Sequence, residues 1–280
     1  MTVAPLVASI PSPSSGSLEI GPLRFNAYGL MIALGVIAAV RITARRAESR
    51  GLFTGEQLSA IAMWAVPAGV VGARIYHVVT DLGAFRGRWL DVAKIWQGGL
   101  GIWGGVLLGV VVGMWRASRL GVDPWWAASM AVPGIAVAQA IGRWGNWWNQ
   151  ELFGRPTDLP WALRVSPGTA IDAGYGAGTT FHPTFLYESL WCLLLAWILV
   201  RIERRWNPGR GRLVAWYVAG YTLERFFVEG LRIDPAHSAG GLRLNQWVSI
   251  VGFVAAVGFL IVDRRRSRVA SAPSTVSPHE

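Results

Sequence analysis

The sequence has little charge and few of the residues on which several classes of protein depend. Charged residues fill only 15% of its 280 positions, too few for the solvated surface of a soluble domain of this size. The single cysteine, Cys192, excludes an intramolecular disulfide, and a lone thiol in an apolar stretch is expected to act as a small hydrophobic group. The only lysine, Lys94, lies outside the apolar stretches, which excludes a retinal protein with a Schiff-base lysine.

Two further absences narrow the choice of function. No histidine, cysteine and acidic residues have the spacing of a metal site, so neither a metal nor another cofactor is predicted. No internal repeat is present, whereas many transporters contain two related halves with broken helices. Arginine–glutamate pairs within a membrane also mark ion paths. A transporter therefore stays as one alternative, and a phospholipid-binding protein that does no chemistry as another.

Apolar residues are abundant. They make up 52% of the chain, which also has 16 tryptophans and a mean hydropathy of +0.38. Seven stretches approach the roughly 20 residues that a helix needs to cross a bilayer. They cover about residues 26–43, 57–79, 98–115, 125–143, 185–202, 213–230 and 245–262. We therefore predict an all-α integral membrane protein with about seven transmembrane helices.

The basic residues indicate a topology. The formal net charge is +10, but the arginines do not gather into one patch for nucleic acid. They follow the first, third, fifth and seventh predicted spans: Arg41, Arg45, Arg46, Arg50, Arg116, Arg119, Arg201, Arg204, Arg205, Arg210, Arg212, Arg264, Arg265, Arg266 and Arg268. Seven crossings place all of them on one side, which the positive-inside rule identifies as the cytoplasm. The N-terminus is then expected outside and the C-terminus inside.

The same topology suggests how the chain is organised. Residues 1–23 form an external segment without the basic start of a cleavable signal peptide, so the first span is expected to be retained. Residues 24–263 form the seven-span domain. Within it, residues 144–184 contain prolines, glycines and a strand-like stretch at 161–165, and are predicted to form a small external cap. Residues 264–280 are predicted to be a basic, disordered cytoplasmic tail.

The densest group of polar residues follows an apolar run at 127–141. Residues 142–151 read Gly-Arg-Trp-Gly-Asn-Trp-Trp-Asn-Gln-Glu. Charges and amides at membrane depth are costly, and usually remain there because they bind or react with something polar. A flanking arginine with an interfacial tryptophan belt is the simpler interpretation. Two asparagines, a glutamine and both signs of charge within ten residues argue against it.

Other spans also carry polar residues. Tyr221, Arg225 and Glu229 lie at steps of four with Arg232 beyond them, so they share one helical face, although the Arg225–Glu229 pair is also explained by mutual neutralisation. Arg74 has the alternative of snorkelling to the interface, and Tyr28 that of a belt tyrosine. The predicted topology places residues from several spans in the outer half of the membrane: Tyr28, Arg74, Trp103, Arg143, Arg225 and Glu229.

Glycines gather at the start of the third predicted span. Those at 101, 105, 109 and 113 repeat every four residues, a spacing that lets helix backbones approach closely. The denser segment at 98–105 is expected either to lie against a ligand or to loosen the helix. Gly98, Gly99 and Gly104 are candidate substrate contacts in this segment.

Two arginines at this depth suit the phosphate of a lipid. Guanidinium stays charged and grips phosphate oxygens in a bidentate manner, which fits Arg143 and Arg225. Asn146, Asn149 and Tyr28 are placed to hold head-group hydroxyls. The residues by themselves indicate a phospholipid-handling site without naming the reaction.

Residues 142–151 resemble the signature of the prolipoprotein diacylglyceryl transferases. The resemblance extends over about residues 20–262 and includes five further segments, at 28–29, 72–74, 96–100, 182–188 and 221–229. It implies transfer of the diacylglyceryl group of phosphatidylglycerol to the lipobox cysteine thiol of a prolipoprotein, in the bacterial cytoplasmic membrane, as the first step of lipoprotein maturation.

The resemblance also implies roles for individual residues. Arg143 would bind the phospholipid and Arg225 would stabilise charge on the leaving phosphate, with Glu151 as the third catalytic candidate. The substrate-binding candidates are Arg143, Tyr28, Asn146, Tyr221, Glu229, Gly98, Gly99 and Gly104.

The sequence departs from the family pattern at one position. Many members have a histidine in the glycine-rich segment, proposed as the base, where this chain has Trp103. Either the base lies elsewhere, with His77, His182 and Glu151 as candidates, or the two arginines lower the pKa of the thiol enough without one. His182 is expected mainly to orient the turn before Pro183.

Overall fold

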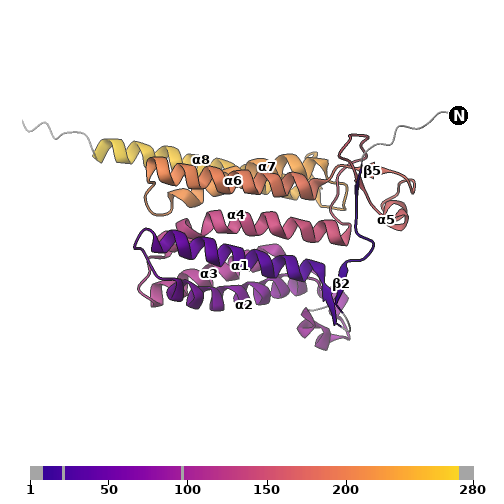
Figure 1. The fold of residues 1–280 in the computed structure, drawn as a ribbon, viewed down its shortest axis with the longest axis horizontal. Helices are drawn as coiled ribbons and strands as arrows, with labels where there is room; N and C mark the ends of the chain where they lie inside the picture. The colour runs from indigo at the N-terminus through magenta and orange to yellow at the C-terminus, as the bar shows by residue number, and fades with distance from the viewer. Residues whose placement is uncertain (1–8, 21–22, 96–97, 271–280) are drawn as a thin grey trace, which may run out of the picture. The chain divides into compact units, whose positions relative to one another are not determined.

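The computed structural model describes residues 9–20, 23–95 and 98–270. Long helices dominate this part of the chain (Figure 1). They are α1 (Ala27–Glu48), α2 (Gly55–Thr80), α3 (Ile102–Arg119), α4 (Pro124–Asn149), α6 (Thr184–Trp206), α7 (Arg212–Leu231) and α8 (Leu244–Ala270). Three short elements complete the helices: η1 (Leu82–Phe85), η2 (Trp89–Ala93) and α5 (Pro167–Asp172).

Within the described residues, five helices are long and apolar enough to cross a membrane: α1, α2, α4, α6 and the Leu244–Arg264 part of α8. The protein is therefore an all-α, multi-pass membrane protein. The other two long helices do not qualify, because α3 is only 18 residues long and includes Arg116 and Arg119, and α7 contains Glu224, Arg225 and Glu229. Seven crossings remain a prediction for this reason.

Two helix boundaries differ from the predicted spans near the candidate site. The third span was expected from residue 98, but α3 begins at Ile102, because Gly98 and Gly99 have φ values of 85° and 71°, which a right-handed helix does not allow. The fourth span was expected to end at 143, but α4 continues to Asn149. At the C-terminus α8 reaches Ala270, so the predicted tail of residues 264–280 begins as helix.

The chain forms two compact units, one from residues up to Ile37 together with those from Ile135 onward, the other from Ala38–Gly134. In the second unit α2 and α3 cross closely. A Cβ on Gly72 would lie 2.3 Å from the Gly104 carbonyl oxygen, and one on Gly104 would lie 2.2 Å from that of Gly72. Gly105, Gly109 and Gly113 also face α2 residues, so their predicted role in helix packing is confirmed.

In the first unit α7 packs against both α6 and α8 (Figure 1). The connection between α4 and α6 folds into a small ordered layer, with sheet order β1 (Ile10–Pro11), β4 (Leu163–Arg164) and β5 (Thr180–Phe181). Strand β4 pairs in parallel with β1 and antiparallel with β5. Its core contains Phe153, Leu163, Val165, Ala170, Phe181 and Phe185. The strand expected at 161–165 is thus present over two residues, while the external location of the layer stays a prediction.

The remaining strands are short hairpins. Strands β2 (Ser17–Ile20) and β3 (Leu23–Asn26) pair just before α1. Strands β6 (Ser238–Ala239) and β7 (Leu242–Arg243) pair between α7 and α8. The second hairpin positions Arg243, whose side chain returns toward the end of α7.

Candidate functional site

Glu188 on α6 is the centre of a buried ionic cluster in the first unit. Its side chain is 2% exposed. Its Oε2 atom lies 2.8 Å from the Nη2 atom of Arg143 on α4 and 3.3 Å from the Nη1 atom of Arg225 on α7. One carboxylate therefore brings together the two arginines that the sequence predicted to share a site.

Arg225 has a second carboxylate partner on its own helix. Its Nη2 atom lies 2.5 Å from Oε2 of Glu229, which is fully buried. The other oxygen of Glu229 lies 2.8 Å from Nε of Arg243 and accepts a hydrogen bond of 3.3 Å from Nδ2 of Asn245. Mutual neutralisation of Arg225 and Glu229 is thus present, but as one link in a longer chain of charges.

The cluster ends in the turn after α7. Asp234 accepts hydrogen bonds from Nε of Arg232 at 2.7 Å and from Nη2 of Arg243 at 2.9 Å. Burial alone would raise the pKa of Asp234, but the hydrogen bonds and charges of these two arginines lower it overall. Asp234 is therefore ionised at neutral pH and fixes the turn. Arg243 also donates to the carbonyl oxygen of Arg232 at 2.8 Å.

The last turn of α4 carries a second group of polar side chains. Asn146 donates from Nδ2 to Oε1 of Glu151 at 2.7 Å, and Asn149 donates to the same oxygen at 3.4 Å. Arg143 approaches the Asn146 Oδ1 atom at 3.4 Å. The signature arginine thus touches both the Glu188 cluster and the Asn146–Glu151 pair.

A left-handed residue returns Glu151 toward Asn146. Gln150 has a φ of 52°, unusual for a residue other than glycine. Its side chain donates to the carbonyl oxygen of Pro13 at 2.7 Å and accepts from the backbone N–H of Ser166 at 2.6 Å. These contacts hold the strained turn in place, a pattern typical of functional sites.

Tyr28 joins the signature from α1. Its hydroxyl interacts electrostatically with Glu151, Arg143 and Asn146. Its ring lies against Gly145, where a Cβ would come within 2.5 Å of the ring carbon Cδ2. The glycine in the signature therefore lets the tyrosine ring pack on the α4 backbone, next to the residues that its hydroxyl approaches.

This packing gives a prediction with a control in the same motif. Gly145→Ala should displace Tyr28, since overpacking costs about 1–3 kcal/mol, and should lower turnover about tenfold or more, one factor of ten per 1.4 kcal/mol. Gly142→Ala should keep full activity, because a Cβ there would meet no atom within 4 Å apart from its chain neighbours and the local helix backbone, and alanine favours a helix. The measurement is the initial rate of each variant at equal amounts of folded protein. Equal rates for both variants would show that Tyr28 does not depend on Gly145.

Three more residues of α6 and α7 lie close to the arginines. Tyr221 stacks on Tyr217 with ring centroids 6.0 Å apart, and interacts electrostatically with Arg143 and Arg225. Cys192 is buried one helical turn after Glu188, so the thiol lies beside a carboxylate at helical spacing, which the sequence analysis overlooked. Glu224 is 6% exposed, and neither of its carboxyl oxygens has a hydrogen-bond partner among the described residues.

The remaining candidates belong to the second unit and form a cluster of their own. Arg74 is buried, so the snorkelling interpretation is wrong. It donates to the carbonyl oxygens of Val92 at 2.8 Å, Gly98 at 2.8 Å and Gly99 at 3.0 Å. This arginine therefore fixes the loop before α3. Gly104 meets α2, and that contact alone accounts for a glycine there.

The alternative bases are also located. His77 packs edge-on against Phe85 in the second unit, with centroids 5.8 Å apart. His182 lies 3.1 Å from the Tyr187 hydroxyl through Nδ1, and burial followed by the charge of Arg155 lowers its pKa. His182 is thus neutral at pH 7 and orients the start of α6, as expected. Trp103 lies on α3 and is half-exposed, while residues 96 and 97 of the same motif lie outside the described residues.

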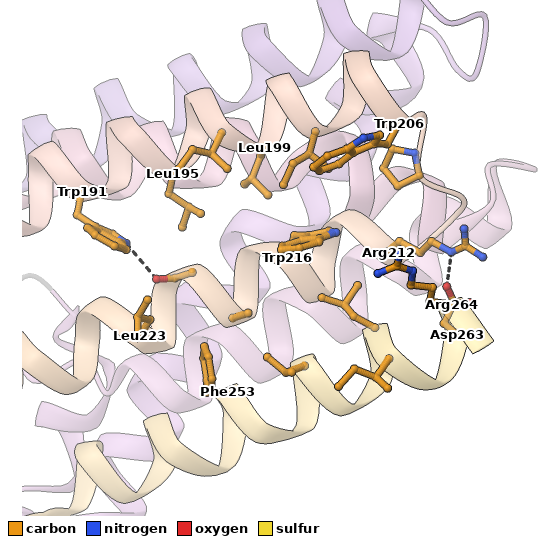
Figure 2. Close-up of a pocket in the computed structure, with 18 residues that line it drawn as sticks. Trp191, Leu195, Leu199, Trp206, Arg212, Trp216, Leu223, Phe253, Asp263 and Arg264 are labelled. Atoms are coloured by element: carbon orange, nitrogen blue, oxygen red, sulfur yellow. Dashed lines mark hydrogen bonds and ion pairs between the residues drawn. The ribbon is translucent and has the colours of Figure 1, made fainter. Parts of the chain in front are cut away.

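An apolar groove of about 1100 Å³ runs between α6, α7 and α8 (Figure 2). Trp191 donates to the carbonyl oxygen of Gly220 at 3.0 Å on one side, and Arg212 pairs with Asp263 at 2.5 Å at the far end. Its lining includes none of Arg143, Glu188 and Arg225. The polar site is therefore the ionic cluster and not this groove.

Comparison with known proteins identifies the family of this chain over most of its length. The family model of the prolipoprotein diacylglyceryl transferases matches residues 16–262. The chain belongs to this family. It is 49% identical over 264 residues to the phosphatidylglycerol–prolipoprotein diacylglyceryl transferase of Streptomyces griseus, covering 92% of this chain and 79% of that protein. The enzyme of the same name from Frankia alni is 51% identical (92% and 68% covered), and that from Cutibacterium acnes 46% identical (97% and 92% covered).

In this prolipoprotein diacylglyceryl transferase, most of the predicted catalytic and substrate-binding residues lie within the first unit: Tyr28, Arg143, Asn146, Glu151, Tyr221, Arg225 and Glu229. Glu188, Glu224, Asp234 and Arg243 were not among the site residues predicted individually from the sequence. Glu188 and Glu224 were included only within the 182–188 and 221–229 segments. A signal for Glu188 existed, because it is an acidic residue near the start of an apolar span, and such residues are retained there for function.

Proposed function

We propose that the protein transfers the diacylglyceryl group of phosphatidylglycerol to the lipobox cysteine thiol of prolipoproteins. A carbon–sulfur bond forms at the carbon of the diacylglyceryl group that carries the phosphate. The bond from that carbon to the phosphate oxygen breaks, and the other glycerol leaves as glycerol phosphate. The thiol gives up its proton in the same turnover. The protein is thereby a membrane-bound transferase of lipoprotein biosynthesis.

The observation that carries this proposal is the position of Arg143 and Arg225 on the single carboxylate of Glu188. Two largely buried guanidinium groups held by one anion make a site into which another anion fits. A phosphodiester oxygen is the natural substitute, since guanidinium binds phosphate and carboxylate with the same fork geometry. Donors fixed in place before the reaction stabilise the charge that develops on the leaving phosphate.

The Asn146–Glu151 pair and Tyr28 are suited to bind the glycerol head group of the lipid. Carboxylate and amide oxygens accept hydrogen bonds from hydroxyls, and a phenol donates them. We assign these three residues to the glycerol head group, next to Arg143. Tyr221 and Glu229 support the arginines. Gly98 and Gly99 remain candidates for a contact from the loop that Arg74 fixes.

A direct test uses purified protein in vesicles of phosphatidylglycerol with a fluorescent peptide containing a lipobox cysteine. We expect a mass increase of one diacylglyceryl group on the peptide and release of glycerol phosphate. Vesicles of phosphatidylethanolamine and a peptide with serine in place of the cysteine serve as controls. Lipid binding without any change in peptide mass would instead support a non-catalytic phospholipid-binding protein.

The arginine distribution leads to a topology prediction. With the C-terminus in the cytoplasm and the 144–184 cap outside, alkaline phosphatase fused within residues 168–178 should be active and the same reporter fused after Arg266 inactive. A cytoplasmic reporter such as green fluorescent protein should give the opposite result at both positions. An active phosphatase at the C-terminus would mean that one fewer or one more helix crosses the membrane.

A further inference from the structure

Glu224 is a buried carboxyl group that the proposed roles leave unused. It lies on α7, directly before Arg225, and its side chain is 6% exposed. Both of its oxygens are inaccessible and lack a hydrogen-bond partner among the described residues. Elsewhere in the cluster Glu188, Glu229 and Asp234 each have an arginine within 3.0 Å. Glu224 is thus a buried acid of the cluster without such a contact.

Its surroundings favour the neutral acid. The groups that act on it electrostatically are Glu188 on α6, Arg143 on α4 and Arg225 on α7, with Cys192 and Tyr221 also in range. Both arginines already contact Glu188. A second carboxylate beside Glu188 would be repelled by it, and an unpaired buried charge costs far more than a neutral carboxylic acid.

The reaction itself needs a group that moves a proton. The thiol begins with a proton that it must lose, and the departing glycerol phosphate carries one more basic oxygen than the phosphodiester did. The transferred proton has to pass between the thiol and the phosphate oxygen among side chains that are largely buried. A buried carboxylic acid on which both phosphate-binding arginines act electrostatically is suited to that task.

We propose that Glu224 is the proton-exchanging residue of the transfer, a proposal that rests on the proposed function. Glu224 in its acid form donates its proton to the phosphate oxygen as the carbon–oxygen bond breaks. The resulting carboxylate takes the proton that the thiol releases as the carbon–sulfur bond forms. Glu224 therefore ends each turnover as it began, and no histidine is needed at the position of Trp103.

The test compares wild-type protein with Glu224→Gln, which keeps the shape of the side chain but cannot exchange a proton. We expect kcat to fall by about 10²–10⁴-fold, the usual contribution of general acid–base catalysis, with KM for phosphatidylglycerol changed by less than about threefold. The wild-type profile of kcat from about pH 5 to about pH 9 should fall on its alkaline side as Glu224 ionises. That alkaline decline should be absent in the residual activity of Glu224→Gln.

Glu203 provides the matched control, since it is another glutamate that is 6% exposed, near the other end of α6. Glu203→Gln should keep the wild-type kcat and pH profile. Glu224→Asp, which retains an exchangeable proton at shorter reach, should keep the alkaline decline and gives the same test if Glu224→Gln does not fold. Wild-type kcat in Glu224→Gln, or a reduced kcat with an unchanged pH profile, would overturn the proposal. Absence of transfer by the wild-type protein would instead overturn the proposed function.

Discussion

Arg143→Ala should nearly abolish diacylglyceryl transfer while the protein remains in the membrane. Its guanidinium contacts Glu188 at 2.8 Å and approaches Asn146 at 3.4 Å, so it links the ionic cluster to the signature. Removal of one preorganised donor to a developing oxyanion typically lowers kcat by about 10²–10³-fold. Loss of a full positive charge beside the leaving phosphate is expected to cost at least that much. The measurement is single-turnover lipidation of the lipobox peptide.

Two comparison variants make this result specific. Arg143→Lys should recover little activity, because an ammonium ion is a point charge and cannot contact Glu188, Asn146 and a phosphate in the planar geometry of guanidinium. Arg164→Ala, at an exposed position of β4, should have wild-type activity. Near-wild-type turnover by the lysine variant would show that only net charge is needed at position 143.

The sequence predicts the helices well because a bilayer imposes a simple rule on them. Five of the seven predicted spans coincide with helices apolar enough to cross a membrane. The α7 helix does not qualify by composition because it carries Glu224, Arg225 and Glu229. The charged residues that α7 contributes to the candidate site thus also lower its mean hydropathy.

Hydropathy says little about where a helix begins or ends when polar residues or glycines stand at its edge. Arg143 marked the expected end of the fourth span, but α4 continues to Asn149 and places Asn146 on the same helix. Glycine spacing is equally ambiguous, because a ligand contact and a helix crossing both require a small residue. At Gly104 the structure has the crossing with Gly72.

The pairing of Glu188 with the two arginines could not be predicted, for a different reason. Arg143 and Arg225 stand out by charge, and the sequence correctly grouped them. Glu188 comes from a third helix, and no periodicity relates its position to theirs. Only tertiary packing within the first unit brings the carboxylate of Glu188 on α6 within reach of Arg143 on α4 and Arg225 on α7.

Glu188→Ala should have the largest effect on stability. Its removal leaves two buried guanidinium groups without the anion that they share, and breaking a buried ion pair by deleting one partner costs about 3–5 kcal/mol. We expect a large decrease in the midpoint of thermal unfolding in detergent micelles. Ser189→Ala is the control from the next position of α6, where loss of the 3.2 Å hydrogen bond from Trp144 should cost about 1 kcal/mol.

Phosphatidylglycerol should restore part of that lost stability if its phosphate occupies the place of the Glu188 carboxylate. A ligand that binds only the folded protein raises its stability in proportion to the logarithm of ligand concentration over Kd. The increase in the unfolding midpoint should be larger for Glu188→Ala than for wild type, because wild-type Arg143 and Arg225 must first release Glu188. Diacylglycerol, which lacks the phosphate, should give no such difference. An equal increase with both lipids would mean that the acyl chains alone stabilise the fold, and would place the phosphate away from Arg143 and Arg225.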